Sequence, residues 1–582
     1  MSIDNNSKNI DINFIDFKLP IFYIQDKYTL NDNVKNDLEI SNSFEHLLYR
    51  KFFNNTDLDN NIFYKDLLNK YSTYYTNNSY FLNDMKYFIK NYSDTSNEYD
   101  INNIQNVYKD INEINNITDK DKDKNFVNTY QYLEIIPIFE FLNRNSLFLQ
   151  CLSLYNIFNP LITIVIPIII MFIPFFIILL KGHYITMANY VEILLTIMKN
   201  HPLGNTIKDF ANVGWDRKFF LTFSLVFYFF NIYQNIISCI KFYKNFNKIN
   251  NYLHIFKNSC KYYINLIDNV NSYCKSSLQG FIDKNNEIKN YLTLFYNNLN
   301  GIKFSNLNIF DLHTMGDKMK YFYELFKCQE YIYSIKYCLY LHSFKDTLLC
   351  IQKNINDKKI NFCKIVNNKE TKIINSYYCC IDSNYITNNI DLKNNIIITG
   401  PNASGKTTIL KSTLFNIILS QQFCCGFYKK AQINPYNYIH SYINIPDTSQ
   451  RDSLFQSEVR RCKYILDSIE TNEGRHFCIF DELYSGTNPT EAISCAYSYL
   501  KYLSTNKNCN FMLTTHFTTL CEKFNSHKNI INNKMNIINN KFTYKLCNGI
   551  SYYKGGINVL KDLNYPDNII KDAENIIQNI NI

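Results

Sequence analysis

The sequence predicts an α/β domain after about residue 380 and a mainly α-helical region before it. In the C-terminal part, short apolar runs alternate with stretches of helical periodicity, which is typical of a parallel sheet covered by helices. Upstream, long stretches such as "HTMGDKMKYFYELFKCQEYIYSIKYCLYLHSF" carry apolar residues at helical spacing. No residue between Arg144 and Lys181 is charged, and a second charge-free stretch covers 219–240, which together predict one or two transmembrane helices within the helical region.

The composition restricts the class of protein only in part. With 582 residues the chain has room for about three or four domains. A formal net charge of +9 permits contact with nucleic acid or anionic lipid and requires neither. The 18 cysteines include no C-x-x-C pair, which argues against a structural zinc site and favours free thiols in a reducing compartment.

Residues 1–130 form a low-complexity N-terminal region to which the sequence assigns no role. Short apolar islands alternate there with polar tracts. The segment 92–125 contains a run of charges and no sustained apolar period. We therefore expect a linker or solvated surface in that segment.

Residues 145–245 are the hydrophobic region of the chain and predict a transmembrane hairpin. The segment 161–180 has 17 apolar residues in 20, and a helix of about 20 such residues spans the roughly 30 Å hydrocarbon core. Such a helix tolerates Pro167 and Pro174. A second charge-free stretch, 219–240, is less apolar and is followed by Lys241, Lys244, Lys248, Lys257 and Lys261. This pattern favours a hairpin with both long arms on the cytosolic side and the lysines at the headgroups.

A buried pair of helices in a soluble intracellular protein is the alternative interpretation of the hydrophobic region. Asn231 and Gln234 would fit that environment better than a bilayer. The next region, 246–378, is predicted to consist of long helices that form a lever or core. Its tyrosine and phenylalanine stripes indicate core packing rather than a surface for stacking bases.

A phosphate-binding loop opens the α/β domain. The run "NNIIITG" is typical of a buried strand, and "GPNASGKT" fits the pattern G-x-x-x-x-G-K-[ST] before a helical stretch. In such an α/β P-loop NTPase, backbone N–H groups surround the phosphates, Lys406 reaches the β and γ oxygens, and Thr407 offers its hydroxyl to Mg²⁺. ATP and Mg²⁺ are therefore the expected ligands. The predicted nucleotide-binding loop comprises Gly400, Pro401, Asn402, Ala403, Ser404, Gly405, Lys406, Thr407 and Thr408.

Two later strands are predicted to deliver acids and a histidine to the same edge of the sheet. The run "HFCIFDE" ends in Asp481, which is placed to hold Mg²⁺ through water, and Glu482, which is placed to orient or deprotonate the attacking water. The run "NFMLTTH" ends at His516, which could sense the γ-phosphate. Lys406, Glu482 and His516 are therefore the predicted catalytic residues of a nucleotide hydrolase, and Thr407 and Asp481 its predicted metal-binding residues.

Several motifs resemble those of one ATPase family. ABC transporters share a loop reading G-P-N-x-x-G-K, but their L-S-G-G-Q and D-E-P-T-x-x-L-D motifs are absent from this sequence. Instead, "DELYSGTNP" resembles the D-E-x-x-x-G-T of the MutS mismatch-repair family, and "TTHFTTL" resembles its T-H-Y-x-x-L. Residues 549–577 are similar to the C-terminal tail of that family. The resemblance implies a MutS/ABC-type ATPase domain at 379–545 and a helical dimerisation segment at 546–582.

Two further motifs assign site residues by resemblance. "YITNNIDL" is similar to the family's F-I-x-N-x-L-x-L, whose aromatic ring stacks on adenine, and this implies that role for Tyr385. "RDSLFQSEVRRCKYIL" resembles S-T-F-x-x-E, whose serine reaches the γ-phosphate held by the opposite subunit, and this implies that role for Ser453. The chain departs from the family here, because "SQRDS" stands where S-G-x-S is usual.

The mismatch reader of the family is not visible in this sequence. That reader inserts a phenylalanine from an N-terminal F-x-E motif beside the faulty base. One F-x-E of this chain, Phe322-Tyr323-Glu324, lies inside a predicted helix and far too late in the sequence. We interpret it as core packing.

The resemblance implies a homodimer, associated through its ATPase domains, that uses ATP to switch a clamp on mismatched or structured DNA in mismatch repair. The predicted spans 161–180 and 219–240 suggest an alternative, a membrane-anchored MutS-derived ATPase with a tethering or remodelling role and its ATPase domain on the cytosolic side. A third hypothesis, an ABC-type transporter subunit, is disfavoured by the missing signature motif. If the two spans are real, the protein is membrane-associated; without them it would be soluble.

Overall fold

The computed structural model divides into two compact units. The first comprises Met1–Thr95, Leu266–Glu287 and Tyr337–Ile582, and the second comprises Ser96–Asn265 and Ile288–Lys336. The structure describes residues 16–40, 47–54, 61–95, 101–115, 126–133, 137–180, 186–198, 215–304, 309–367, 370–381, 384–443, 445, 454–539, 541–553, 555, 557, 560–561 and 563–579.

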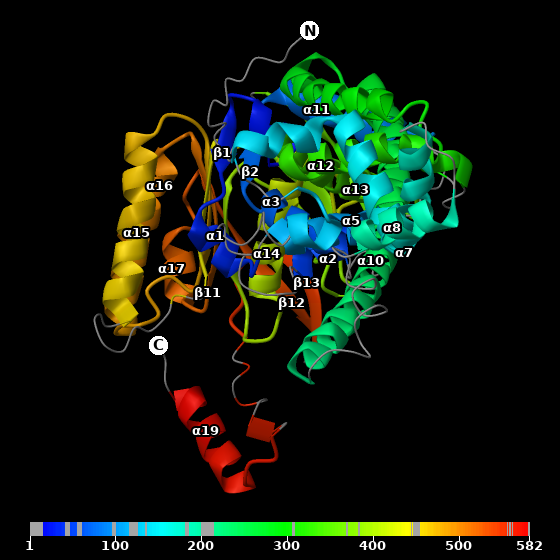
Figure 1. The fold of residues 1–582 in the computed structure, drawn as a ribbon. Helices are drawn as coiled ribbons and strands as arrows, with labels where there is room; N and C mark the ends of the chain where they lie inside the picture. The colour runs from blue at the N-terminus through cyan, green and yellow to red at the C-terminus, as the bar shows by residue number, and fades with distance from the viewer. Residues whose placement is uncertain are drawn as a thin grey trace. The chain divides into compact units, whose positions relative to one another are not determined.

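A six-stranded sheet organises the C-terminal part of the first unit (Figure 1). Its strands lie in the order β13, β12, β6, β11, β10, β9, and all neighbours are parallel except the β12–β13 hairpin. The run of isoleucines in β6 is buried throughout, as expected for a strand covered on both faces. The strands span Asn395–Thr399 (β6), Tyr438–Tyr442 (β9), His476–Asp481 (β10), Cys509–Thr515 (β11), Ile530–Ile538 (β12) and Lys541–Asn548 (β13).

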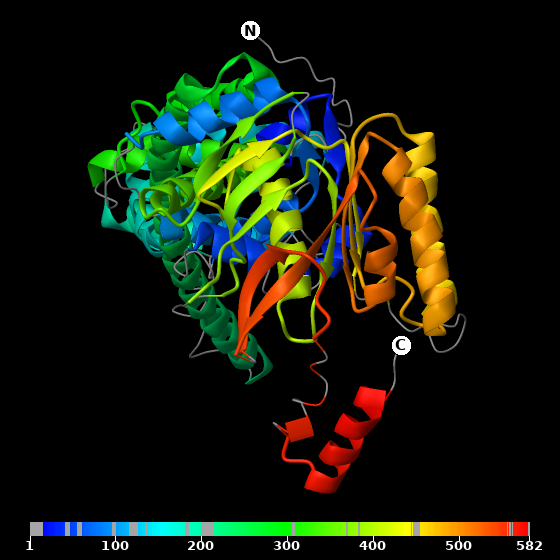
Figure 2. The same ribbon diagram turned by 180° about the vertical axis from the view of Figure 1, so that it is seen from behind.

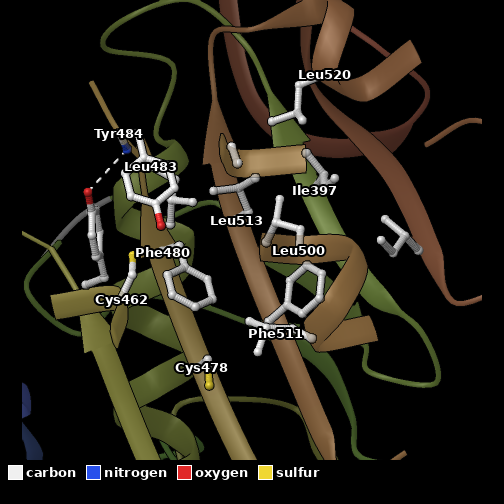
Figure 3. Packing of buried hydrophobic residues seen from close by; sticks show 14 of the residues in the cluster. Ile397, Cys462, Cys478, Phe480, Leu483, Tyr484, Leu500, Phe511, Leu513 and Leu520 are labelled. Atoms are coloured by element: carbon white, nitrogen blue, oxygen red, sulfur yellow. Dashed lines mark hydrogen bonds between the residues drawn. The ribbon is translucent and has the colours of Figure 1, made fainter. Parts of the chain in front are cut away.

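Helices cover both faces of this sheet, as the α/β pattern predicts. The helices α15 (Leu454–Thr471), α16 (Pro489–Thr505) and α17 (Thr518–Lys523) lie on one face, and α14 (Lys406–Phe423) lies on the other (Figures 1 and 2). Figure 3 shows the core beneath α15 and α16, where Phe480 and Phe511 from the strands meet Leu500 from α16. This core fixes the strand ends that carry the predicted acids.

A second, five-stranded sheet packs in the same unit. Its order is β5 (Asn388–Asp391), β4 (Lys372–Ser376), β8 (Lys430–Ile433), β3 (Asn361–Ile365) and β7 (Cys425–Gly426). The prediction of long helices up to residue 378 is therefore wrong for its last part. Strands β3 and β4 are short and pair with β8, about 60 residues later in the chain, so helical periodicity alone could not identify them.

The N-terminal residues of the first unit pack on the helix that follows the phosphate-binding loop. The side-chain amide of Gln422 in α14 donates to the carbonyl oxygens of Tyr71, at 2.7 Å, and Tyr74, at 2.8 Å. This unit therefore joins residues that we had placed in separate domains. The N-terminal elements are Pro20–Tyr23 (η2), Lys27–Thr29 (β1), Asp32–Asp37 (α1), Leu47–Phe53 (α2), Ile62–Tyr71 (α3), Tyr74–Thr76 (β2) and Ser79–Asn91 (α4).

The second unit is helical in its described residues. Within the segment 92–125, which we had interpreted as linker or solvated surface, residues Ile101–Asn115 form α5. Its Ile104, Val107 and Ile111 are buried, at the three- and four-residue spacing of one helix face. The prediction of a linker or solvated surface is wrong for α5, because its apolar residues form one narrow stripe among many polar and charged residues.

Long helices dominate the rest of the helical region, as predicted. The F-x-E triplet lies in α12, where Phe322 and Tyr323 are buried, which confirms their assignment to core packing. The helices are Ser146–Leu180 (α7), Met187–Met198 (α8), Trp215–Tyr273 (α10), Gln279–Asn298 (α11), Met315–Lys327 (α12), Gln329–Asn356 (α13) and, near the C-terminus, Asp567–Asn579 (α19); the 3₁₀ segments are Pro137–Arg144 (η4), Ser276–Leu278 (η5) and Ile309–Thr314 (η6).

The two predicted spans fall within α7 and α10. By length and composition, the described residues contain two helices that could cross a membrane, located in these two elements. Their apolar side chains are largely exposed, for example Phe172 on α7 and Phe227 on α10. The two helices therefore do not form the buried core pair that we considered as an alternative.

Candidate functional site

The loop between β6 and α14 has the backbone geometry of a phosphate-binding loop. Gly405 precedes the helix with φ = +93°, a left-handed conformation that glycine adopts without strain. A Cβ on Gly400 would lie 2.9 Å from Ser404 Oγ, which shows how closely the loop backbone folds on itself. The Ser404 hydroxyl donates to the carbonyl oxygen of Pro401 at 2.7 Å. The sequence pattern thus produces a tight turn directly before the N-terminus of α14, where anions bind favourably.

Lys406 folds back over this loop. It is buried, and its ammonium donates to the carbonyl oxygens of Gly400 at 3.0 Å and Pro401 at 3.1 Å. Burial lowers the pKa of Lys406, while the charges of Glu482 and Asp481 act in the opposite direction. A buried ammonium beside two carboxylates is suited to bind the oxygens of a polyphosphate.

Asp481 lies at the end of β10 and receives hydrogen bonds from both sides. The Thr407 hydroxyl donates to Asp481 Oδ2 at 2.8 Å, and the Thr514 hydroxyl donates to the other carboxylate oxygen. Thr514 is opposite Asp481 in the parallel pairing of β10 with β11. Hydroxyl and carboxylate oxygens are the donors that Mg²⁺ prefers beside a bound phosphate, so the predicted pair Thr407 and Asp481 has the right chemistry for this ion.

The side chains of Glu482 and His516 contact each other beside Lys406. The Nε2 atom of His516 lies 2.8 Å from Glu482 Oε1 and 3.1 Å from Lys406 Nζ. The hydrogen bond with His516 is the main reason that the pKa of Glu482 is lowered, and the positive charges of His516 and Lys406 add to it. Glu482 also has φ = +53°, a strained conformation for a residue with a side chain. The site therefore holds an ionised carboxylate in a fixed direction.

A cavity of about 580 Å³ adjoins the loop. The loop and the first turn of α14 line this cavity, as do Tyr377, Tyr378, Ile386 and Tyr544. Tyr385, predicted to stack on adenine, instead has its ring on Tyr377, with centroids 4.1 Å apart and planes at 17°. The tyrosine pair thus stands beside the cavity, and the role of Tyr385 stays a prediction.

The predicted site residues converge from three separate parts of the sequence. The loop residues 400–408, the acids 481 and 482, and His516 are brought together at the carboxyl ends of β6, β10 and β11. Ser453 lies outside the residues that the structure describes.

Two functional residues were not identified from the sequence. The Thr514 hydroxyl is a hydrogen-bond partner of Asp481. Its position in the run that ends at His516, on the strand parallel to the one that carries Asp481, could have indicated this contact. Glu458 is buried in α15 and accepts hydrogen bonds from the backbone N–H groups of Ser485, at 3.0 Å, and Gly486, at 3.2 Å. It belongs to the stretch that resembles S-T-F-x-x-E, and it holds the turn that follows Glu482.

Comparisons with known proteins agree with this geometry. Residues 396–581 match the family model of MutS domain V. The chain is 29% identical over 236 residues to the DNA mismatch repair protein MutS of Orientia tsutsugamushi, a match that covers 38% of this chain and 26% of that protein. It is 26% identical over 239 residues to the DNA mismatch repair protein Msh3 of Dictyostelium discoideum, with coverage of 38% and 16%.

The matched part of the chain thus spans about a quarter or less of the length of these two relatives. The residues that match the family model, 396–581, include the phosphate-binding loop, both acids and His516. This likeness, together with the order of the motifs, shows that residues 396–581 are similar to MutS domain V.

Proposed function

We propose that the chain binds ATP with Mg²⁺ and hydrolyses it at the carboxyl edge of the six-stranded sheet. The observation that carries the proposal is the convergence of Lys406, Thr407, Asp481, Glu482 and His516 beside one cavity. Thr407 and Asp481 would hold Mg²⁺, which neutralises phosphate charge when it is bound. Lys406 binds the β and γ oxygens, and Glu482 orients the attacking water and accepts its proton.

We further propose that nucleotide binding switches a homodimer. In this arrangement Ser453 of one subunit reaches the γ-phosphate held by the other, Tyr385 supports the adenine, and the segment 546–582 packs the two chains together. ATP shifts the equilibrium toward a closed dimer because it contacts both subunits only in that state. Hydrolysis removes those contacts and returns the dimer to the open state.

The substrate class of the clamp is proposed from the relatives. Two of them are named DNA mismatch repair proteins of the MutS and Msh3 type, so we propose that this chain binds mismatched or structured DNA. Binding by electrostatic contact with phosphates would weaken steeply as salt concentration rises.

The experiment measures ATP hydrolysis by the full chain with homoduplex, heteroduplex and branched DNA. We expect heteroduplex or branched DNA to change the rate, and Glu482→Gln to lower single-turnover hydrolysis by about 10²–10⁴-fold while ATP still binds. The matched control is Glu473→Gln, an exposed glutamate outside the site. Full hydrolysis by the Glu482→Gln variant would contradict the assigned role, and indifference to every DNA would contradict the substrate class.

A second candidate is a membrane-anchored MutS-derived ATPase with a tethering or remodelling role. The exposed apolar side chains of α7 and α10 favour it. It predicts the same dependence of hydrolysis on Glu482 but no response to heteroduplex DNA. The DNA series above therefore separates the two functions, since only the clamp on DNA requires that response.

A further inference from the structure

Apolar side chains on the outer faces of α7 and α10 have no part in the proposed ATPase chemistry. Residues 145–180 and 219–240 contain no charge. Phe172 on α7 is 56% exposed and Phe227 on α10 is 59% exposed. Such a continuous apolar surface is rare on proteins that are surrounded by water. Other exposed apolar residues of these stretches are Ile162, Ile164, Val165, Ile166, Ile168, Ile169, Phe175, Phe176 and Leu179 on α7, and Phe219, Phe223, Val226, Phe229, Phe230, Ile236, Ile237 and Ile240 on α10.

Several polar groups of the same stretches contact the neighbouring helix. The Tyr228 hydroxyl donates to the carbonyl oxygen of Thr163 at 2.8 Å, and the Asn235 amide donates to the Thr163 hydroxyl oxygen at 3.3 Å. One turn away, the Cys239 thiol donates to the carbonyl oxygen of Ile157 at 3.4 Å. Polar contacts between helices with apolar residues outside are typical of helices packed in a membrane.

The contact of Tyr228 satisfies a specific backbone group. In a regular α-helix the carbonyl of Thr163 would accept from the N–H of residue 167, but residue 167 is a proline and has no N–H. The tyrosine hydroxyl of the other helix supplies the missing donor. In hydrocarbon no water can do so, and neighbouring helices commonly satisfy the carbonyl that a proline leaves free.

The length of the charge-free stretch of α10 and the residues at its ends match a bilayer. The contacts between residues 157 and 239 and between 163 and 235 place the two helices antiparallel. The charge-free stretch 219–240 is about 33 Å long at 1.5 Å per residue, against a hydrocarbon core of about 30 Å. At one end the exposed Lys241, Lys244 and Lys248 could contact anionic headgroups. At the other end lies Trp215, the single tryptophan of the chain, which is 85% exposed.

We propose that α7 and α10 form a helical hairpin that inserts into a lipid bilayer, with the lysines at 241–248 and Trp215 at opposite interfaces. Tryptophan and lysine are the residues that commonly occupy these interfaces. Asn231 and Gln234 are also exposed on α10 and oppose insertion, but the exposed apolar side chains around them are far more numerous. The hairpin places a MutS-family ATPase at a membrane.

Trp215 provides the test in the unchanged protein. The full chain is purified in mild detergent and reconstituted into vesicles of phosphatidylcholine and phosphatidylserine. In the vesicles we expect the tryptophan emission to lie at shorter wavelength than that of a water-exposed tryptophan, and iodide to quench it less. Nitroxides near the headgroups should quench it more than nitroxides at the bilayer centre. Tryptophan emission in the vesicles that iodide quenches fully and that no lipid nitroxide quenches would overturn the proposal.

Charged substitutions on the outer face provide the second test. The triple variant Ile169→Asp, Phe172→Asp and Phe227→Asp should lose flotation with the vesicles, because each aspartate would lie in hydrocarbon. The control is Leu294→Asp, an exposed leucine in α11, which should float like the original chain. Circular dichroism verifies that both variants remain helical.

The same samples distinguish a protein partner from lipid. If the apolar face is an interface between two copies of the chain, the original protein will stay in the supernatant without detergent as a dimer. The triple variant will then be a monomer by light scattering. These two results together would overturn insertion. Insertion is supported if the original chain pellets and resists carbonate extraction while the triple variant does not.

Discussion

At the scale of single residues, His516 lowers the pKa of Glu482. Its hydrogen bond is the largest cause of the lowered pKa of Glu482, so this carboxylate stays ionised at a lower pH than an ordinary glutamate. In His516→Asn the pKa should rise toward the ordinary value of 4.5. The acid limb of the pH profile of ATP hydrolysis should then move to higher pH. Single-turnover rates at saturating ATP would measure this shift.

The matched control for this prediction is His527→Asn. His527 lies outside the predicted site, where its ring contacts Phe524. Its replacement should leave the acid limb in place. An unchanged limb in His516→Asn would show that the hydrogen bond does not control Glu482 during turnover.

Glu458 shows how one buried carboxylate can organise a turn. Beside the two backbone N–H groups, its Oε1 atom accepts from the Ser485 hydroxyl at 3.0 Å. Glu458→Ala removes three hydrogen bonds to a buried carboxylate, so we expect the free energy of unfolding to fall by about 1.5–3 kcal/mol. Urea unfolding measures this loss, and Glu473→Ala, at an exposed position, should change the value by less than about 0.5 kcal/mol. Equal midpoints for the two variants would contradict the structural role of Glu458.

At the scale of elements, α14 links the nucleotide loop to the N-terminal residues. Gln422 at its end donates to two carbonyls of the α3–β2 segment and accepts from the Tyr49 hydroxyl at 2.9 Å. Its methionine variant has a similar volume but removes these three hydrogen bonds; the Tyr49 hydroxyl still donates to the carbonyl of Tyr71 at 3.1 Å, whereas the carbonyl of Tyr74 loses its side-chain donor. We therefore expect Gln422→Met to lower the free energy of unfolding by about 2–4 kcal/mol.

Limited proteolysis tests whether this loss is local to the packed elements. Cleavage within the N-terminal residues should become faster in Gln422→Met, because the α3–β2 segment would separate more readily from α14. The control Gln279→Met changes an exposed glutamine at the start of α11. Its cleavage pattern should match that of the original chain, and an identical pattern in both variants would contradict the coupling.

At the scale of the whole molecule, a buried histidine makes stability depend on pH. Burial, and secondarily the charges of His476 and Arg461, lower the pKa of His440 to about 3. The unfolded chain takes up a proton near pH 6.5, whereas the folded chain does so only near pH 3. The stability that neutral His440 contributes is thus complete above pH 6.5 and decreases as pH falls toward 3.

His440→Gln should remove part of this acid sensitivity. A glutamine does not titrate, so the decline of the urea midpoint between pH 6.5 and pH 4 should be shallower than in the original chain. His254→Gln, an exposed position on α10, is the control and should keep the original slope. Parallel declines in all three proteins would show that other groups dominate acid unfolding.

Local patterns in the sequence determined the elements that carry the chemistry. A buried strand, a glycine loop and a helix stand in direct succession, so their arrangement around Lys406 follows from neighbouring residues alone. Asp481, Glu482 and His516 were predictable because each ends an apolar run that reads as a strand. The apolar stretches 161–180 and 219–240 were visible for the same reason, since each is continuous in the sequence.

Tertiary structure alone decided which distant residues meet. Thr514 reaches Asp481 because parallel pairing aligns β10 with β11, and Glu458 reaches the turn at 485 because α15 packs over the sheet. Strands β3 and β4 are stabilised by pairing with β8, and the α3–β2 segment by packing on α14. Such contacts depend on loop closure and complementary packing between distant segments, which no local period encodes. The sequence by itself therefore determined the chemical groups of the site, and tertiary packing decided their partners and the unit that holds them.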